Sequence, residues 1–549
     1  MQIFKPVFIL FFTLFSVDIY AQYNGLGFSY PLDRDVVVTG NYGELRPNHF
    51  HAGLDFSTDP MKNLPIKAVA DGYISRIKIS SGGYGRVLYV THNNGYVTVY
   101  AHEKRYAPKI DAYIRQKQLE QKKNEIEVFP AANDLVVKKG EVIGYTGNTG
   151  SSTGPHLHFE IREEKSEIPI NPLLVYPVKD DIKPTLTHIA FYNTTDTNYI
   201  SQQIVHAVKN SKGGILNNTI ILNQNTFAVA FSGYDQANGT TNKNNIYEAK
   251  LTLDSQLIYH HQLNNISFDN ARYVNYFSEK SNGIKFQKCF TPTCYNIGLY
   301  KTAINGGKVE LKDTLMHQMN LTVADERGNT QQFIFYVRAK KIGGYKTGST
   351  LYNAYCNKDC NVKKDDIEFS IKAGTLTRSL FIPAYRNKLG RAVIGNNKDE
   401  LLLQPYTLSF KVFNSVKGKE DKMIAMNEDH CVIGKYANGW FTCETKYFGM
   451  FAISYDTIAP SIKCTIPAKK QQDLSAHKAI SFKVDDKLSG IAEYNIYIND
   501  VWQIAEYDAK SDLITCYFDD STPKGELSIR LEVVDRVNNK AGVAFKSKR

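Results

Sequence analysis

Short segments of alternating apolar and polar residues run through most of the chain, and they constrain its fold more than any other feature. "YTLSFKVFN", residues 406–414, is one example, and turn-forming Asn, Gly and Asp residues separate such segments. Alternation with a period of two places one set of side chains on each face of a strand. Aromatic residues, which favour strands, reach 12% of the composition. The sequence therefore predicts a mainly β protein.

The length of 549 residues is too great for one hydrophobic core, so we expect several domains. A charged, helix-forming segment, "KIDAYIRQKQLEQKKNE", interrupts the strands of the first domain and predicts a helical insertion at about 105–130. The expected units are a signal peptide at 1–21 and domains at 22–180, 181–340, 341–456 and 457–549.

Two of these domains resemble each other in sequence. "NLTVADERGNTQQFIFYV" near residue 330 is similar to "SIRLEVVDRVNNKAGVAF" at the C-terminus, and "FAVAFSGYDQANG" is echoed by "AISFKVDDKLSG". Both pairs indicate strand, Asp-containing turn and strand. We predict a weak internal repeat, at about 182–340 and 457–549, of immunoglobulin-like β-sandwiches. The region 341–456 is expected to be a β-rich domain of unknown type.

The N-terminus has the features of a secretory signal peptide. One lysine precedes an apolar run from Pro6 to Val17, and small and polar residues follow as far as Ala21. An uncleaved anchor is the alternative, but the run is short for a membrane span. We expect an exported protein, in the periplasm, the cell envelope or the outside medium, with no membrane span after signal cleavage.

The net charge of +11 is modest for this length. It would attract an acidic polymer of the cell envelope, or it only keeps the protein soluble. No basic run or interleaving of aromatic and basic residues indicates a nucleic-acid partner, so we expect none.

All eight cysteines lie beyond residue 288, and an exported chain favours disulfides. Pairing of sequence neighbours, one of 105 connectivities, would join 289–294, 356–360, 431–443 and 464–516. A zinc cluster is the alternative for four of them, Cys289, Cys294, Cys356 and Cys360.

Six of the 13 histidines fall between residues 49 and 158. If "FHAGLDF" (residues 50–56) is a strand, His51 and Asp55 share the face opposite its apolar residues, with a gap at Gly53 between them. In "PHLHFEIR", His156 and His158 likewise share the face opposite Leu157, Phe159 and Ile161.

A third segment, "YVTVYAH", places His102 on the face of Tyr96, Thr98 and Tyr100, opposite its small apolar residues. One strand of this kind is usually an accident of surface composition, but three in one small domain predict a common site. Zinc suits two imidazoles and one carboxylate, and a catalytic zinc site keeps a fourth position for water.

Other hydrolytic sites have little support. There is no His-Glu-x-x-His motif, which excludes a thermolysin-like site, and no Gly-x-Ser-x-Gly elbow. The first domain contains no cysteine, so a thiol nucleophile is not expected there.

Four ordered motifs resemble the M23 metallopeptidases, the lysostaphin- and LytM-type endopeptidases of peptidoglycan. They are His51-x-x-x-Asp55, "YAH" ending at His102, "GNTGSSTGPHLHFE" at 147–160 and "KAVADGYI" at 67–74. The resemblance covers about residues 40 to 175 and implies an antiparallel-sheet catalytic domain with a narrow groove. The trailing β domains extend beyond the minimal family unit.

The resemblance also implies roles for the site residues. The zinc ligands would be His51, Asp55 and His158, and the pair His102 and His156 would handle the attacking water and stabilise the transition state. The family spacing selects His51 over His49, which would lie on the rim of the groove. The implied function is zinc-dependent cleavage of peptide cross-links in bacterial peptidoglycan.

Two rival functions remain open. One is a non-catalytic protein that binds the cell wall or activates other hydrolases, because some members of the family have lost their zinc ligands. The other is a secreted peptidase directed at foreign walls or at proteins. The C-terminal β domains could bind glycan, dock an envelope protein partner or space the catalytic domain from a surface.

Overall fold

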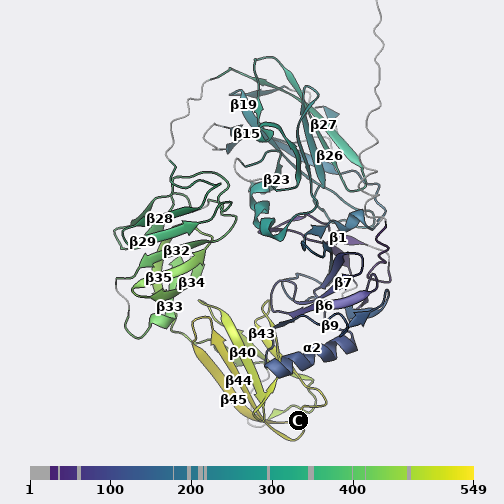
Figure 1. Ribbon diagram of the computed structural model, residues 1–549, viewed down its shortest axis with the longest axis vertical. Helices are drawn as coiled ribbons and strands as arrows, with labels where there is room; N and C mark the ends of the chain where they lie inside the picture. The colour runs from purple at the N-terminus through teal and green to yellow at the C-terminus, as the bar shows by residue number, and fades with distance from the viewer. Residues whose placement is uncertain are drawn as a thin grey trace, which may run out of the picture.

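The computed structural model describes residues 25–549 with short gaps. The gaps are 35–36, 59–62, 177, 195–199, 208–213, 216–218, 293–296, 344–351, 399, 414–415, 429 and 466–471. The expected signal peptide lies outside the described residues. The described part is mainly β, as predicted, and its sheets are almost entirely antiparallel (Figure 1).

A nine-stranded sheet forms the first domain. The main path runs β1 (Val38–Gly40), β4 (Leu54–Ser57), β13 (His156–Glu163), β8 (Tyr96–Ala101), β7 (Arg86–His92), β6 (Gly72–Ile79) and β10 (Ile126–Val128). Two short strands pair off this path, β11 (Val136–Val137) with β6 and β14 (Pro169–Ile170) with β13. The apolar residues of β13, Leu157, Phe159 and Ile161, are fully buried in the core beneath the sheet.

Smaller elements surround this sheet. A three-stranded sheet contains β5 (Pro65–Lys67), β12 (Val142–Tyr145) and β9 (Arg105–Tyr106), and a two-stranded one contains β2 (Leu45–Arg46) and β3 (His49–Phe50). The charged insertion forms the helix α2 (Pro108–Gln121), and a 3-10 turn, η1, covers Pro172–Leu174. Ile110 and Ile114 fix α2 to the first core.

The expected strand over residues 50–56 is interrupted. β3 ends at Phe50 and β4 begins at Leu54, so His51 and Gly53 lie in the connection between them. A Cβ on Gly53 would lie 2.2 Å from the carbonyl oxygen of Phe159, which means that glycine is needed where the connection crosses β13. The gap at Gly53 therefore serves backbone packing and is not an open space beside a metal.

Residues 185–339 form two sheets around one core. One sheet has the order β16 (Ile200–Ala207), β15 (Thr185–Thr194), β19 (Thr226–Tyr234), β23 (Ile284–Lys288) and β22 (Ser278–Ser281), with β25 (Val309–Glu310) on β19. The other has the order β17 (Gly214–Ile215), β27 (Thr330–Ala339), β26 (His317–Ala324), β20 (Glu248–Leu253), β21 (Gln256–Gln262) and β24 (Tyr300–Ala303), with β18 (Ile220–Leu222) on β27. Phe191 and Phe335, from opposite sheets, meet edge to face in this core.

Short helical elements lie beside this sandwich. They are η2 (Phe268–Tyr273), α3 (Val274–Phe277) and η3 (Ile304–Gly307). Tyr273, Val274 and Phe277 pack against Tyr42 and Phe50 of the first domain in a separate apolar cluster. This cluster joins the sandwich to the loop that carries His51.

A single nine-stranded sheet makes up the third unit. Its order is β28 (Cys360–Lys364), β29 (Ile367–Ile371), β32 (Tyr406–Lys411), β35 (Trp440–Thr445), β34 (His430–Ala437), β33 (Met423–Asn427), β36 (Gly449–Tyr455), β31 (Ala392–Ile394) and β30 (Ala384–Arg386), and η4 spans Glu420–Lys422. Phe369 of β29 and Ile394 of β31 share one core although they lie near opposite ends of the order, so the sheet curves around that core.

The last unit is again two sheets around one core. One contains β37 (Ser461–Cys464), β39 (Ala479–Asp485), β43 (Leu513–Tyr517) and β42 (Glu506–Asp508). The other contains β38 (Gln472–Asp473), β45 (Lys540–Lys548), β44 (Glu526–Asp535), β40 (Ile491–Ile498) and β41 (Val501–Gln503). Phe482 from the first sheet and Leu531 from the second are buried together.

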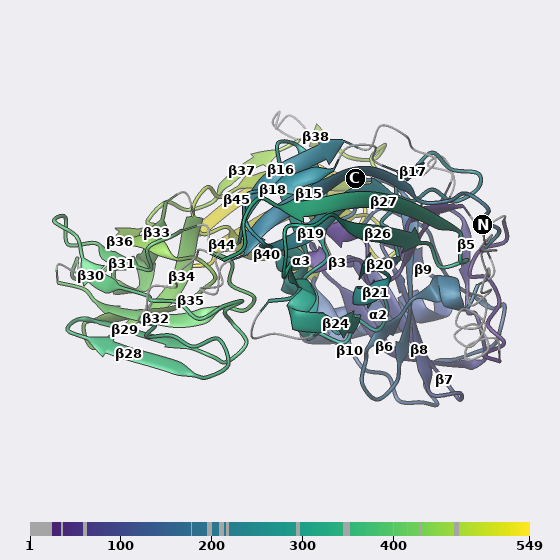
Figure 2. The same cartoon turned by 90° about the horizontal axis from the view of Figure 1, so that it is seen from above.

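The last unit of the chain returns to the first domain and lies beside α2. The third unit lies away from the first domain (Figures 1 and 2). The buried Asn124, just beyond α2, donates to the carbonyl of Tyr494 at 2.8 Å and accepts from the amide of Ala505 at 2.8 Å. Ion pairs Arg86–Glu506 and Arg115–Asp519 flank this contact.

The predicted pairing of neighbouring cysteines is wrong. Six cysteines are free: Cys289, Cys360, Cys431, Cys443, Cys464 and Cys516. Each predicted pair contains at least one of them. Cys356 is disulfide-bonded, which also removes its thiolate from the alternative zinc cluster, and Cys294 lies outside the described residues. One pair shows why sequence proximity failed: Cys464 in β37 and Cys516 in β43 belong to one sheet, but β39 lies between their strands.

No helix within the described residues is long and apolar enough to span a membrane.

Candidate metal centre

Strand pairing brings three of the predicted side chains together. Asp55 in β4 and His158 in β13 are direct cross-strand partners. His51, in the connection before β4, is held by its backbone amide, which donates to the carbonyl of Glu44 at 2.9 Å. All three side chains are buried, with 2–5% of each residue exposed.

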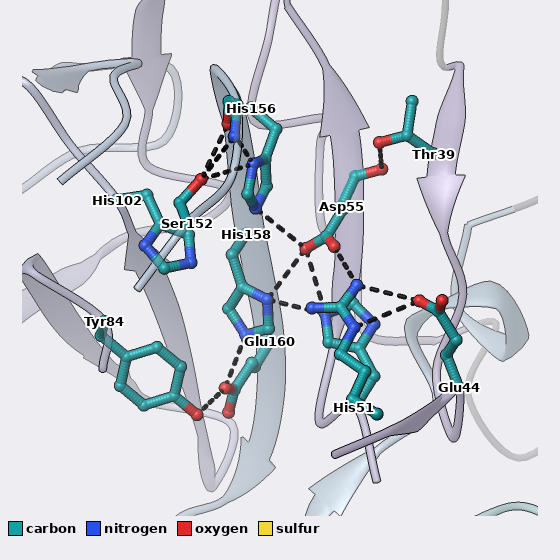
Figure 3. Close-up of polar contacts among 12 residues, drawn as sticks. Thr39, Glu44, His51, Asp55, Tyr84, His102, Ser152, His156, His158 and Glu160 are labelled. Atoms are coloured by element: carbon teal, nitrogen blue, oxygen red, sulfur yellow. Dashed lines mark hydrogen bonds and ion pairs between the residues drawn. The ribbon is translucent and has the colours of Figure 1, made fainter. Parts of the chain in front are cut away.

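The ligand atoms of these residues converge (Figure 3). His51 Nε2 lies 2.8 Å from His158 Nδ1, and both nitrogens lie 3.0 Å from Asp55 Oδ1. The opposite nitrogen of each ring is fixed by an acceptor. His51 Nδ1 is 2.7 Å from the carbonyl of Asn41, and His158 Nε2 is 2.8 Å from Glu160 Oε1. Since these acceptors require a hydrogen, each neutral ring turns its lone pair toward Asp55.

Three acceptor atoms this close repel one another unless a proton or a cation lies between them. Burial disfavours a charged ring, but the bonds to Asp55 and Glu160 outweigh it and raise the pKa of His158 to about 9. A divalent cation among these three atoms would relieve the same repulsion, and a lone-pair set of two imidazoles and one carboxylate fits zinc. The donor set thus fits the metal that the sequence predicts.

Charged neighbours orient the three candidate ligands. Glu160 accepts from His158 through one oxygen and from Arg162 Nε, at 2.7 Å, through the other, while the Tyr84 hydroxyl also donates to it. Burial raises the pKa of Glu160, but Arg162 and His158 lower it to about 2, so it is ionised. Arg46 contacts the outer oxygen of Asp55 and leaves Oδ1 for the two histidines.

His102 reaches the same site, but not by strand parity. β8 ends at Ala101, and His102 has a left-handed backbone with φ of 62°. This turn moves its ring from the face of Tyr100, which lies in the core, to the opposite face beside His156 and His158. The ring centroids lie 4.8 Å from His156 and 5.8 Å from His158. The predicted face of His102 is therefore wrong, although its place in the common site is as expected.

Two further histidine rings, those of His102 and His156, lie beside these residues. His102 Nδ1 donates to the carbonyl of Thr149 at 2.8 Å, and burial together with the charges of His158 and His156 lowers its pKa to about 3. His156 Nδ1 donates to the carbonyl of Gly154 at 2.8 Å. His156 Nε2 is buried without a hydrogen-bond partner and lies 3.4 Å from Asp55 Oδ1. Both rings can accept a proton on Nε2.

This arrangement coincides with a match to a known family model. Residues 49–119 and 126–172 match the model of peptidase family M23, and the interval between them begins in the last turn of α2. The first domain is an M23 peptidase domain. The family implies a bound metal, and His51, Asp55 and His158 could hold one.

Curated relatives of the M23 domain include named metallopeptidases. An uncharacterized metalloprotease of Haemophilus influenzae is 34% identical over 161 residues, 28% of each chain. The DD-carboxypeptidase/endopeptidase Mpg of Neisseria meningitidis is 36% identical over 125 residues, 23% of this chain and 22% of that protein. Lysostaphin of Staphylococcus simulans is 29% identical over 117 residues, 21% of this chain and 19% of that one. The chain thus spans less than a third of the length of each of these relatives.

Solved structures similar to the M23 domain include the catalytic domain of lysostaphin from Staphylococcus simulans. It is 26% identical, with a TM-score of 0.19, and the match covers 25% of this chain and 90% of that one. A zinc-containing peptidase from Vibrio cholerae is 25% identical, with a TM-score of 0.20, and covers 27% of this chain and 40% of that one.

Other domains hold the loops around the M23 site. Asn41, whose carbonyl orients His51, donates to the carbonyl of Asn245 in the second unit at 2.9 Å and accepts from its amide at 3.2 Å. Lys510 of the last unit donates to the carbonyls of Asn148 and Ser152, at the loop before His156. The M23 site is therefore supported from two sides by sandwiches distant in sequence.

His49 lies apart from the three-residue group. Its ring is exposed, and Nδ1 is 2.9 Å from the carbonyl of Pro47. Sequence reasoning missed Arg46 and Tyr84, whose contacts have no local signal, and Arg162, which shares the strand face of His156 and His158. Glu160 could have been found, because it stands on the same strand face as His156 and His158.

Proposed function

We propose that the chain is a zinc-dependent endopeptidase that hydrolyses peptide cross-links of bacterial peptidoglycan. The observation that carries this proposal is the convergence of three lone pairs from His51, Asp55 and His158, with two more imidazoles beside them. Lysostaphin, Mpg and the cell division protein DipM of Caulobacter vibrioides, all similar to the M23 domain, support the choice of a cell-wall substrate.

In this proposal His51, Asp55 and His158 hold zinc, which when bound polarises a carbonyl and acidifies water. His102 and His156 act as a pair. One of them accepts the proton of the attacking water, and the other steadies the developing oxyanion or protonates the leaving amine. Burial and the neighbouring histidines lower the pKa of His102 to about 3, so that ring is neutral at physiological pH.

The proposal includes export to the periplasm or cell envelope, where this substrate lies. The C-terminal β domains could also contact an envelope partner. Lys510 and its neighbours bring the last unit to the loop before His156, so a partner bound to that unit would lie near the M23 site.

The test is mass spectrometry of muropeptides released from cross-linked sacculi. We expect zinc-loaded protein to release peptides with new amino termini, and a His158→Ala variant to release none. Comparison of stem-peptide and Gly-bridged walls identifies the bond that is cut. Zinc-loaded protein that binds sacculi without cleaving them would instead support a wall-binding or activator protein.

A further inference from the structure

Two groups of three aspartates lie outside the histidine site. They are Asp180, Asp235 and Asp325 in the second unit and Asp456, Asp486 and Asp535 in the last unit. In each group one carboxylate oxygen from every residue lies within 4.8 Å of the others. Four of the six residues are buried, and the other two, Asp180 and Asp486, are partly buried. Three negative charges at such distances repel strongly in a buried site.

The first aspartate of each group lies in the segment that enters its sandwich. Asp180 precedes β15 and Asp456 precedes β37. Asp180 Oδ1 accepts from the amide of Ile182 at 3.0 Å, and Asp456 Oδ1 accepts from the amide of Ile458 at 3.2 Å. The same local turn therefore presents both carboxylates.

The second aspartate follows a strand of the first sheet in each sandwich. Asp235 comes directly after β19, and Asp486 directly after β39. β19 pairs with β15, and β39 pairs with β37, so each of these strands lies beside the strand that the entering segment leads into. The two positions correspond in the fold.

The third aspartate of each group has matching bonds to an asparagine. Asp325 accepts from the amide and side chain of Asn329 at 2.8 and 2.7 Å, and Asp535 accepts from Asn539 at the same two distances. Asn329 also donates to the backbone carbonyl of Asp180, as Asn539 does to that of Asp456. The same arrangement of aspartate-bearing turns therefore occurs in both sandwiches.

The negative charge of the first group is only partly compensated by the protein, through the nearby Arg327. Asp235 is 4% exposed, and its Oδ1 is buried without a hydrogen-bond partner. Burial and the charges of Glu326, Asp325 and Asp180 raise the pKa of Asp235 to about 8. The nearby Arg327 donates to the backbone carbonyls of residues 173 and 176. Burial outweighs the charge of Arg327 and raises the pKa of Asp180 to about 6.

There is space for one ion beside these carboxylates. A cavity of about 20 Å³, lined by Asp180, Asp235 and Glu326, lies where the first domain meets the second unit. The second group also has an unsatisfied buried atom beside it. Ser489 donates its amide to Asp456 Oδ2 at 3.1 Å, while its hydroxyl oxygen is buried without a partner.

We propose that each group binds one calcium ion, so that the chain holds two. Carboxylate oxygens are hard ligands, and neither group contains the imidazole or thiolate that zinc prefers. Each ion would tie the entering segment to two turns at the same end of its sandwich. It would therefore fix that sandwich to the preceding unit of the chain.

The test is equilibrium dialysis of radioactive calcium with the full-length, zinc-loaded protein, so that the histidine site is already occupied. We expect two saturable sites per chain, with affinities of about 10⁻⁴ M or tighter. Asp235→Asn and Asp486→Asn should each remove one site, and the double variant should remove both. Asp181→Asn and Asp485→Asn are matched controls, because these exposed neighbours lie outside the two groups, and they should retain both sites.

Thermal melting gives a second measurement. Calcium should raise the melting temperature of the wild-type protein by several degrees, a result that does not depend on the folding of any variant. Each single variant should then lose part of that increase. Absence of saturable binding, or unchanged stoichiometry in the double variant, would overturn the proposal. Equal binding of magnesium at the same two sites would overturn the assignment to calcium.

Discussion

Asp55 and His158 face each other across neighbouring antiparallel strands, with Asp55 Oδ1 3.0 Å from His158 Nδ1. The pairing of β4 with β13 therefore sets the separation of two candidate ligands before any metal binds. His51 completes the group from a connection whose path depends on Gly53.

Replacement of a candidate ligand should abolish metal binding. We expect His158→Ala and His51→Ala to reduce zinc to well below one ion per chain, since each removes one of three converging donors. Elemental analysis of purified protein measures this. His49→Ala is the matched control and should keep its zinc, because His49 is exposed and outside the group. Zinc lost from His49→Ala but kept by His51→Ala would reverse the assignment.

Removal of His102 should separate catalysis from metal binding. Its ring is bonded to the carbonyl of Thr149 and does not belong to the converging group. We expect His102→Ala to keep stoichiometric zinc and to lose turnover by about 10²–10⁴-fold, the usual contribution of a proton-transfer group. Muropeptide release and elemental analysis on the same preparation test both parts. Undiminished turnover would remove His102 from the mechanism.

Glu160 should control metal affinity without contacting the metal. It holds the hydrogen of His158 on Nε2, so that Nδ1 keeps its lone pair for the site. Glu160→Gln should weaken zinc binding by about 10–100-fold, as loss of such partners does elsewhere. Competition with a chromogenic chelator measures the affinity. Glu163→Gln, on the exposed end of the same strand, should leave it unchanged.

Acid should remove a stabilising contact from the second unit. Burial raises the pKa of Glu248, but bonds from His260 at 2.6 Å and Lys250 at 2.7 Å lower it to about 2. A carboxyl with a lowered pKa stabilises the fold above its unfolded pKa, near 4.5, and this contribution is lost as pH falls from 4.5 toward 2.

The corresponding experiment compares the wild type with Glu248→Gln. The variant should melt at a lower temperature at pH 6, by an amount equivalent to at most about 3 kcal/mol, and the difference should shrink toward pH 2–3. A difference that stays constant over this range would show that Glu248 acts through packing and not through its charge.

Asn124 should hold the last unit against the M23 domain. It is 8% exposed and bonded to the backbone at Tyr494 and Ala505. Asn124→Ala should cost about 1–3 kcal/mol, because it leaves two buried backbone groups unpaired. Hydrogen exchange should then accelerate in residues 108–128 and 491–508. Asn94→Ala, in an exposed hairpin turn, should leave both segments protected.

The sequence predicted the fold class and the helix well, because alternation and helix-forming composition are local properties. The hairpin of β7 and β8 also follows from local turn residues. Parity failed at His102, since the left-handed backbone of His102 itself, directly after the strand, turns its side chain to the opposite face. The strand at His51 broke because Gly53 must pass close to β13, a contact between residues more than a hundred positions apart.

Long-range contacts account for what was missed. The bonds between Asn41 and Asn245 join residues 204 positions apart, and neither residue type nor spacing predicts them. The cysteine pairing failed for the same reason, since strand order and not sequence distance decides which thiols meet.

The contact between Asn124 and Tyr494 joins residues 370 positions apart, and this has a consequence for synthesis. A ribosome completes the M23 domain long before it adds the residues that dock beside α2. During that interval the helix has an unprotected outer side, and the loop before His156 lacks the bond from Lys510. Loss of the C-terminus by early termination or proteolysis would return the peptidase domain to that earlier state. The docked arrangement therefore requires the residues around Tyr494, Ala505 and Lys510 to be present.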